Sequence, residues 1–343
     1  MKIRQFFNCA VISMTLTMVF VPVIGCARSD KSKTETSDTV SHNRSVGKRS
    51  GGPQLGQPGG GPAIDKSGDS VLQAMIKEVV PRFRHLEYED AVTGKIMKYN
   101  LLSPEKTEKG KSYPLVLFMA DASTPGENYD TPLEQGYGAL VWGTKKWQAV
   151  HPCFVLVPQF SGVAVNDEYQ HTEEVDIVIR LVKDIAGREN VDTDRLYTTG
   201  QSMGGMISMY YNITYPNLFA ASLFVDCHWD TSLFGELAKH KFVYVTAGNS
   251  GHSWGDIKPL EAAAEKDGVR YEYAQWSARL PQQEQDSFAI EMLAKGAPVN
   301  IINFTPKSVL PADGKGSEHM YSFDYAYRLT PVLEWVFRQK KLE

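Results

Sequence analysis

The sequence predicts an α/β domain built on a mainly parallel sheet with helices on both faces. Three observations favour this fold class. Short apolar runs of strand length alternate with segments of helical periodicity. Some runs, such as residues 115–119, are apolar throughout, as expected of a strand buried on both faces. A glycine-rich turn at residues 200–205 joins a strand-like run directly to a helix-like run.

The chain begins with a segment that resembles an export signal and is set aside from the fold. Lys2 and Arg4 precede an apolar stretch at residues 6–21, and the sequence Val-Ile-Gly-Cys follows, closing on Cys26. That ending resembles a bacterial lipobox, in which the cysteine is acylated. We therefore expect a lipoprotein signal peptide at residues 1–25 and extracytoplasmic attachment to a bacterial membrane through Cys26. An ordinary signal peptide or a short uncleaved anchor is the alternative.

Residues 26–68 are rich in Ser, Thr, Lys, Asp, Gly and Pro, and almost nothing there can fill a core. We expect a disordered linker, followed by one α/β domain at residues 69–343. The formal net charge is -4, and the predicted domain has no basic cluster. This charge pattern argues against nucleic acid as a partner.

The number and spacing of the cysteines bear on two questions: whether the domain contains a disulfide, and whether it binds a metal. Cys9 and Cys26 belong to the N-terminal segment, which leaves Cys153 and Cys227 in the domain. An exported protein can pair them in a disulfide, but they fall at the ends of non-neighbouring predicted strands, so we expect free, buried thiols. No Cys/His cluster has metal-ligand spacing and no glycine-rich phosphate loop is present, so neither a metal nor another cofactor is expected.

The predicted elements follow in chain order. Residues 85–91 and 96–102 form an opening antiparallel hairpin, joined by a turn that contains Thr-Gly-Lys. Buried strands are expected at 115–119, 154–157 (ended by Pro158), 195–199, 221–225, 242–246 and 299–304. Helices are expected at 175–185, 206–213 and 329–337.

The turn at residues 200–205 reads Gly-Gln-Ser-Met-Gly-Gly. A Gly-x-Ser-x-Gly between a strand and a helix has the layout of a nucleophile elbow, which holds the serine hydroxyl clear of the sheet. Ser202 is therefore the candidate nucleophile. The alternative is a glycine-rich turn that contains a serine by chance. A serine hydroxyl needs a hydrogen-bonded base to become a good nucleophile.

His319 is the candidate base. In a fold of this kind the chain order is serine, acid, histidine, and His319 lies in a glycine-containing loop between the last predicted strand and the closing helix. Its alternative interpretation is a surface histidine. His228 and His252 fall on loops at the functional edge of the sheet, where either can line a pocket.

The acid that would orient this histidine is the weakest part of the pattern. It is expected in the loop at residues 247–256, where Asp256 is the only carboxylate. Asn249 lies nearer the strand end and can orient a ring without supplying charge. Asp256 can instead cap the helix that follows it. Asp226 and Asp230, after the preceding strand, are further candidates.

An oxyanion hole requires two backbone N–H donors. One is expected from Met203, the residue after the nucleophile. The other is expected from the loop after residues 115–119, at Asp121 or Ala122.

Aromatic residues occur on the same predicted loops. Trp142, Trp229 and Trp254 are candidates for lining a substrate cleft, where a sugar or an aromatic ester would stack. The alternative is that they pack in the core, as aromatic side chains usually do.

With these residues assembled, the chain resembles the α/β-hydrolase branch of predicted peptidases and esterases, akin to feruloyl-esterase, polyhydroxybutyrate-depolymerase and prolyl-oligopeptidase-like domains. The resemblance spans residues ~85–340, and the segments that carry it are 113–118, 151–159, 194–205 and 316–320. It implies an α/β-hydrolase fold and ester hydrolysis through an acyl-enzyme, with Ser202 as nucleophile and His319 as base. The sequence departs from the branch at Ala120, where relatives often have histidine, and at Asn249, where relatives often have the acid.

We therefore expect a serine carboxylic ester hydrolase that acts on acyl or feruloyl esters of polysaccharides or similar compounds. Its partners would be that small-molecule or polysaccharide-linked ester and the membrane that holds its lipid. A serine peptidase of the prolyl-oligopeptidase-like type is the second hypothesis. A surface binding protein that kept the fold while its triad degenerated is the third.

Overall fold

The computed structural model describes Leu55, residues 63–249 and residues 251–341. The predicted signal peptide, Cys26 and the linker up to residue 62, apart from Leu55, lie outside the described residues. Within the described part of the chain, none of the helices combines the length and the apolar character needed to cross a bilayer.

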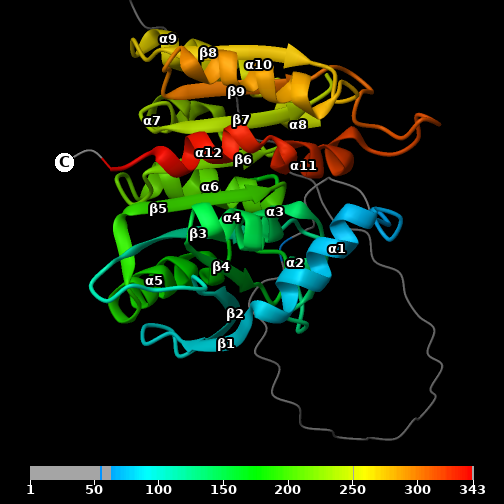
Figure 1. Ribbon diagram of the computed structural model, residues 1–343. Helices are drawn as coiled ribbons and strands as arrows, with labels where there is room; N and C mark the ends of the chain where they lie inside the picture. The colour runs from blue at the N-terminus through cyan, green and yellow to red at the C-terminus, as the bar shows by residue number, and fades with distance from the viewer. Residues whose placement is uncertain (1–54, 56–62, 250, 342–343) are drawn as a thin grey trace, which may run out of the picture. The chain divides into compact units, whose positions relative to one another are not determined.

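One mixed sheet organises the described domain, with the strand order β1-β2-β4-β3-β5-β6-β7-β9-β8 (Figure 1). The pairs β1–β2 and β2–β4 are antiparallel, and every other neighbouring pair is parallel. The strands are β1 (Arg84–Glu89), β2 (Ile96–Leu102), β3 (Tyr113–Met119), β4 (Phe154–Gln159), β5 (Val191–Gln201), β6 (Ala221–Val225), β7 (Phe242–Ala247), β8 (Tyr271–Trp276) and β9 (Val299–Phe304).

Helices cover both faces of this sheet (Figure 1). One face carries α1 (Ser70–Val79), α3 (Tyr137–Leu140), α4 (Lys145–Val150), α10 (Gln282–Ala294), α11 (Glu318–Arg328) and α12 (Thr330–Arg338). The other carries α5 (Glu173–Arg188), α6 (Met203–Thr214), α7 (Phe234–Leu237) and α9 (Ile257–Lys266). The remaining helices are α2 (Thr131–Glu134), α8 (Gly251–Gly255), η1 (Val80–Arg82), η2 (Val141–Gly143) and η3 (Thr231–Leu233).

The two helical layers enclose two separate hydrophobic cores, and β3 contributes to both. Val116 and Phe118 pack beneath the layer that contains α11 and α12. Leu115 and Leu117 pack beneath the layer that contains α5 and α6. Successive strand residues point to opposite faces, so an uninterrupted apolar run is what a strand between two cores requires.

Every predicted strand and helix has a counterpart in the structure, with some bounds shifted by a few residues, but helices such as α1, α4 and α10 were not predicted. Three further differences have a physical reason. β8 escapes prediction because it is an edge strand with polar and half-exposed residues rather than an apolar run. The closing helix is preceded by α11, so His319 lies in a helix rather than in a loop. β4 continues through Pro158 instead of ending there, because its pairing with β3 stops at Leu156 and a proline is tolerated where a strand is paired on one side only.

The free state predicted for the two domain cysteines is confirmed. Cys153 and Cys227 are both unpaired and buried. Burial raises the pKa of each thiol, the Cys153 value to about 12, so both remain protonated and unreactive near neutral pH.

Candidate active site

The turn between β5 and α6 has the geometry of a nucleophile elbow. Ser202 has φ 49° and ψ -121°, a strained conformation for a residue with a side chain. A Cβ on Gly200 would collide with the main chain of Gly204, and a Cβ on Gly204 would collide with the carbonyl oxygen of Met119. The glycines on either side of the serine are therefore required by close main-chain approaches, which hold Ser202 at the end of the strand.

His319 lies against this serine. Its Nε2 is 2.9 Å from the Oγ of Ser202, within hydrogen-bond distance, although the two residues are 117 positions apart in the chain. His319 lies in the first turn of α11. The Phe323 ring, one turn further on, packs roughly perpendicular to the imidazole, with 5.0 Å between ring centroids. The structure thus brings together the two residues that the sequence singled out as nucleophile and base.

The carboxylate beside this histidine is that of Asp226. Asp226 Oδ2 lies 3.7 Å from His319 Nδ1, which is ion-pair distance but longer than a hydrogen bond. Such contacts are often long in a free enzyme and tighten when substrate binds. Asp226 directly follows β6, is 1% exposed, and has a positive φ of 41° like the serine at the end of the neighbouring strand.

Two serine hydroxyls hold the Asp226 carboxylate. Ser253 Oγ donates to Asp226 Oδ1. Ser322 Oγ lies 2.7 Å from Asp226 Oδ2 and 2.7 Å from the His319 carbonyl oxygen, and its single proton can serve one of them at a time. The carboxylate is therefore fixed from both sides, by α8 and by α11. Ser253 and Ser322 were not among the predicted site residues, because no local pattern marks a serine as a partner of a distant carboxylate.

The prediction that Asp256 orients the histidine is corrected by this geometry. Asp256 stands at the start of α9, where its Oδ2 accepts a hydrogen bond of 3.1 Å from the backbone N–H of Trp229. Its side chain makes no capping hydrogen bond to α9, so the alternative role of helix cap is not observed either. Burial raises the pKa of Asp256 to about 7.

The other acid candidates also lie away from the imidazole. Asn249 is exposed beyond the end of β7, and Asp230 caps η3 by accepting from the Ser232 N–H at 2.9 Å. At the end of β7 itself stands Gly248, where a Cβ would collide with the carboxylate of Glu318. The usual position of the acid is thus filled by a side chain from α11. The signal that pointed to Asp226 was its place directly after a parallel strand, next to the strand that ends at the serine.

Charges around His319 favour its protonated form. Burial acts to lower its pKa, but the adjacent Asp226, with smaller contributions from Asp121 and Asp167, outweighs burial and raises the pKa above the usual 6.5. An imidazolium formed by accepting the serine proton would therefore be stabilised where it forms.

The two segments predicted to form an oxyanion hole meet at the elbow. Met203 is the first residue of α6, where backbone N–H groups have no partner within the helix. The end of β3 is pressed against the same helical turn, since Gly204 has no room for a Cβ beside the carbonyl oxygens of Met119 and Ala120. Asp121 and Ala122 follow at once; Asp121 is 2% exposed and its N–H points to Gln135 Oε1 at 3.4 Å.

The prediction that three tryptophans line a cleft is wrong for two of them. Trp142 is 1% exposed and packs in the core against Trp147 and Phe337. Trp229 is 3% exposed and packs between Tyr169 and Tyr210. Indole rings gain so much from burial that a position on a loop does not keep them at the surface.

Trp254 and the two histidines predicted on loops take different positions, and His252 lies in α8 rather than in a loop. Trp254, on α8, is 44% exposed, so its ring is available to a ligand. The His228 ring stacks on that of His252 at 4.5 Å, and its Nε2 lies 3.0 Å from Asp167 Oδ1. Burial lowers the pKa of His228, which keeps that ring neutral near neutral pH.

Comparisons with known proteins bear on the fold. No family model matches the chain, and no curated protein matches it. Among solved structures, the chain is similar to a thermostable esterase, with a TM-score of 0.63 and 21% identity over 77% of this chain and 64% of that one. The chain thus spans less than two thirds of the length of that esterase.

Two further solved structures superpose less well. A ferulic acid esterase has a TM-score of 0.48 and 13% identity over 75% of this chain and 98% of that one. A putative dipeptidyl aminopeptidase IV from Bacteroides ovatus has a TM-score of 0.48 and 11% identity over 75% of this chain and 36% of that one. The mainly parallel sheet, the helices on both its faces and the likeness to the thermostable esterase together show that the chain has the α/β-hydrolase fold.

Proposed function

We propose that the protein is a serine hydrolase that cleaves carboxylic esters through an acyl-enzyme on Ser202. The observation that carries this proposal is the contact of 2.9 Å between Ser202 Oγ and His319 Nε2 at a strained strand-to-helix turn. The proposed substrates are acyl or feruloyl esters, including esters of carbohydrates. Asp226 replaces Asp256 as the residue proposed to position the histidine.

The geometry supports the following steps. His319 Nε2 accepts the Ser202 proton as Oγ attacks the ester carbonyl carbon, and the carbonyl oxygen becomes an oxyanion. The N–H of Met203 and one from the loop after β3 are the proposed donors to that oxyanion. His319 then protonates the departing alcohol, which leaves the acyl group on Ser202. A water molecule, deprotonated by His319, attacks the acyl-enzyme, and the acid product leaves as the proton returns to Ser202.

The non-catalytic alternative loses its main support. It was motivated by the lack of an acid after β7, but a buried carboxylate follows β6 instead and lies at ion-pair distance from His319. Nothing in the described site favours a peptide over an ester, so a comparison of amide with ester substrates tests the peptidase hypothesis.

Ser202→Ala tests the proposal. We expect the wild-type protein to hydrolyse p-nitrophenyl acetate, butyrate or ferulate and to react with a fluorophosphonate probe, whereas the variant loses both activities because the attacking oxygen is gone. Ser208→Ala is a control, because Ser208 is a buried α6 serine that donates to the Gly204 carbonyl oxygen and lies away from His319. Ester turnover retained by pure Ser202→Ala would refute the assignment, and cleavage of amides without esters would favour the peptidase.

We further propose that Cys26 carries a lipid that holds the domain outside the cytoplasm at a bacterial membrane. The support is the sequence: a basic start, an apolar stretch and Val-Ile-Gly before the cysteine. Acyl chains on one cysteine add about 0.8 kcal/mol of membrane affinity for each buried methylene, so two or three chains suffice for anchoring.

A further inference from the structure

Ser322 lies where the carboxylate of Asp226 meets the helix that carries His319. It is buried on α11, one turn after the histidine. Its Oγ is 2.7 Å from Asp226 Oδ2 and 2.7 Å from the carbonyl oxygen of His319. Both of these oxygens are acceptors, so the hydroxyl group, which has one proton, can donate to only one of them at a time.

The carboxylate oxygen that Ser322 contacts is also the one that faces the imidazole. Asp226 Oδ2 is 3.7 Å from His319 Nδ1, which is too far for a hydrogen bond. Ser253 donates to the other oxygen, Oδ1, from α8. To form a hydrogen bond with Nδ1–H, Oδ2 has to move away from Ser322 or share its charge between two donors. A donating Ser322 therefore weakens the hold of the carboxylate on the ring.

The two acceptors of Ser322 define two arrangements of the site. In the first, Ser322 donates to Oδ2 and keeps the carboxylate apart from the ring, which matches the separation of 3.7 Å. In the second, the hydroxyl turns to the His319 carbonyl oxygen, as helical serines do with a carbonyl of the preceding turn, and Oδ2 moves to Nδ1. No covalent bond changes between the two arrangements, because the Ser322 O–H group only rotates and the Nδ1 proton stays on the ring.

We propose that Ser322 is a positioning residue that holds Asp226 back from the neutral histidine and releases it to the imidazolium. The role rests on the proposed function, in which His319 accepts the Ser202 proton. Once the ring is positively charged, its Nδ1–H group attracts a carboxylate more strongly than a neutral hydroxyl does. The carboxylate therefore acts mainly in the transition state, where a stabilising interaction accelerates the reaction.

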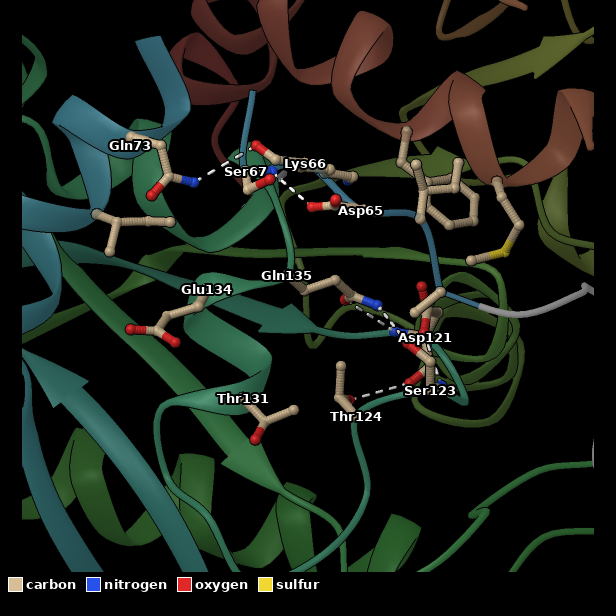
Figure 2. Close-up of a pocket in the computed structure, with 15 residues that line it drawn as sticks. Asp65, Lys66, Ser67, Gln73, Asp121, Ser123, Thr124, Thr131, Glu134 and Gln135 are labelled. Carbon is tan, nitrogen blue, oxygen red and sulfur yellow. Dashed lines mark hydrogen bonds between the residues drawn. The ribbon is translucent and has the colours of Figure 1, made fainter. Parts of the chain in front are cut away.

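Other charged groups also face His319, and a Ser322 variant leaves them unchanged. Burial acts to lower the pKa of His319, while the carboxylate after β6 raises it, with smaller contributions from Asp121 after β3 and Asp167 after β4. Figure 2 shows Asp121 at the edge of a cavity of about 430 Å³. The ring of His228 is neutral near neutral pH because burial lowers its pKa. A difference between the wild type and a Ser322 variant therefore reports on the Ser322 hydroxyl.

The pH dependence of kcat/KM for p-nitrophenyl acetate tests this role. In Ser322→Ala no hydroxyl competes for Oδ2, so the imidazolium is stabilised more. The midpoint of the acid limb should then rise by about half a pH unit to one pH unit, as expected for one hydrogen bond. Ser322→Cys keeps nearly the same volume with only a weak donor, so its midpoint should also rise. Both variants are checked for folding by circular dichroism.

Ser208→Ala is the matched control. Ser208 is another buried helical serine, but it donates to the Gly204 carbonyl oxygen and contacts the Thr198 hydroxyl instead of a carboxylate. Its removal should leave the midpoint of the acid limb at the wild-type pH. An unchanged or lowered midpoint in Ser322→Ala, or an equal shift in Ser208→Ala, would overturn the proposal.

Titration of the His319 ring by nuclear magnetic resonance measures the same pKa without turnover. The His319 signal is assigned by its loss in His319→Gln, and its pKa should rise in Ser322→Ala. In the Asp226→Asn background the charge on Oδ2 is gone, so adding Ser322→Ala should shift this pKa much less. A shift of the same size in that background would show that Ser322 does not act through Asp226, and would sink the proposal.

The two measurements also separate the role of Ser322 from the esterase function. If the ring pKa rises in Ser322→Ala but the wild type hydrolyses no ester, the esterase function fails while the competition for Oδ2 stands. If the wild type hydrolyses esters but the ring pKa does not rise in Ser322→Ala, the role of Ser322 fails and the esterase function stands.

Discussion

At the scale of single residues, the site depends on which carboxylate faces His319. Asp226 is buried and lies at hydrogen-bond distance from the hydroxyl groups of Ser253 and Ser322. Its Oδ2 is 3.7 Å from the imidazole Nδ1 of His319. Asp256 is also buried, but it accepts its hydrogen bond from the backbone N–H of Trp229. A carboxylate near the imidazole fixes the ring orientation and stabilises the imidazolium. The two aspartates therefore form a matched pair for mutagenesis.

Asp226→Asn is expected to lower kcat/KM for p-nitrophenyl acetate by about 10³–10⁴, because the imidazolium loses its counter-charge. Asp256→Asn should leave kcat/KM within about threefold of the wild type, since an asparagine oxygen can accept the same Trp229 N–H. Circular dichroism checks that both variants fold. The reverse order of effects would restore Asp256 as the positioning acid.

The raised pKa of His319 predicts the acid limb of the pH profile. The base works only when neutral, so activity falls as pH drops through its folded pKa, which lies above 6.5. The midpoint of kcat/KM against pH should therefore lie above 6.5 in the wild type. In Asp226→Asn the imidazole of His319 stays buried but loses the attraction of the carboxylate. The midpoint should therefore move to lower pH. A wild-type midpoint below 6.5 would contradict the charge arrangement described for the site.

At the scale of elements, two close approaches determine where the reacting groups stand. Gly204 lets the end of β3 reach the first turn of α6, and Gly248 makes room for the Glu318 carboxylate at the end of β7. Glu318 also accepts the Lys307 N–H, so the start of α11 is tied to the loop after β9. With the end of β7 filled in this way, the carboxylate that meets the imidazole comes from β6, the strand next to the serine.

Gly204→Ala tests the close contact between the end of β3 and the first turn of α6. Its Cβ would push the main chain of Met119 and Ala120 away from α6, at a cost of about 1–3 kcal/mol in unfolding free energy. Displacing the proposed oxyanion donors should also lower kcat/KM by about 10²–10³. Gly187→Ala in α5 is the control, because its Cβ meets nothing within 4 Å and should not destabilise the fold. Denaturant unfolding and ester kinetics measure both effects, and equal behaviour of the two variants would refute the steric argument.

At the scale of the whole molecule, the parallel strands collect residues from distant parts of the chain at one edge of the sheet. β3, β5 and β6 are neighbours in the sheet, and their C-terminal ends lead into Ala120, Ser202 and Asp226. Because all three strands run in the same direction, residues that are far apart in sequence lie close together at this edge of the sheet. The fold, rather than any local motif, assembles the site.

The proposed anchor makes a prediction at the same scale. Full-length protein produced in a bacterium that acylates lipoproteins should sediment with membranes, and Cys26→Ser should move it to the soluble extracytoplasmic fraction with its kcat/KM unchanged, because Cys26 is remote in sequence from the domain. Cys9→Ser serves as the control and should stay with the membranes. A Cys26→Ser protein that remains membrane-bound would favour an uncleaved apolar anchor.

The sequence by itself determined the fold class, the elbow serine and the histidine, because these depend on local patterns. Apolar runs mark strands buried between two cores, and a tight strand-to-helix turn demands glycines around Ser202. Only the tertiary structure decided the rest. Whether Asp226 or Asp256 meets the imidazole depends on which strand ends lie side by side, and whether Trp142 lines a cleft or fills a core depends on the layer packed above it. Asp226 and His319 are 93 positions apart, and Trp142 and Phe337 are 195 positions apart, so no local pattern records these contacts.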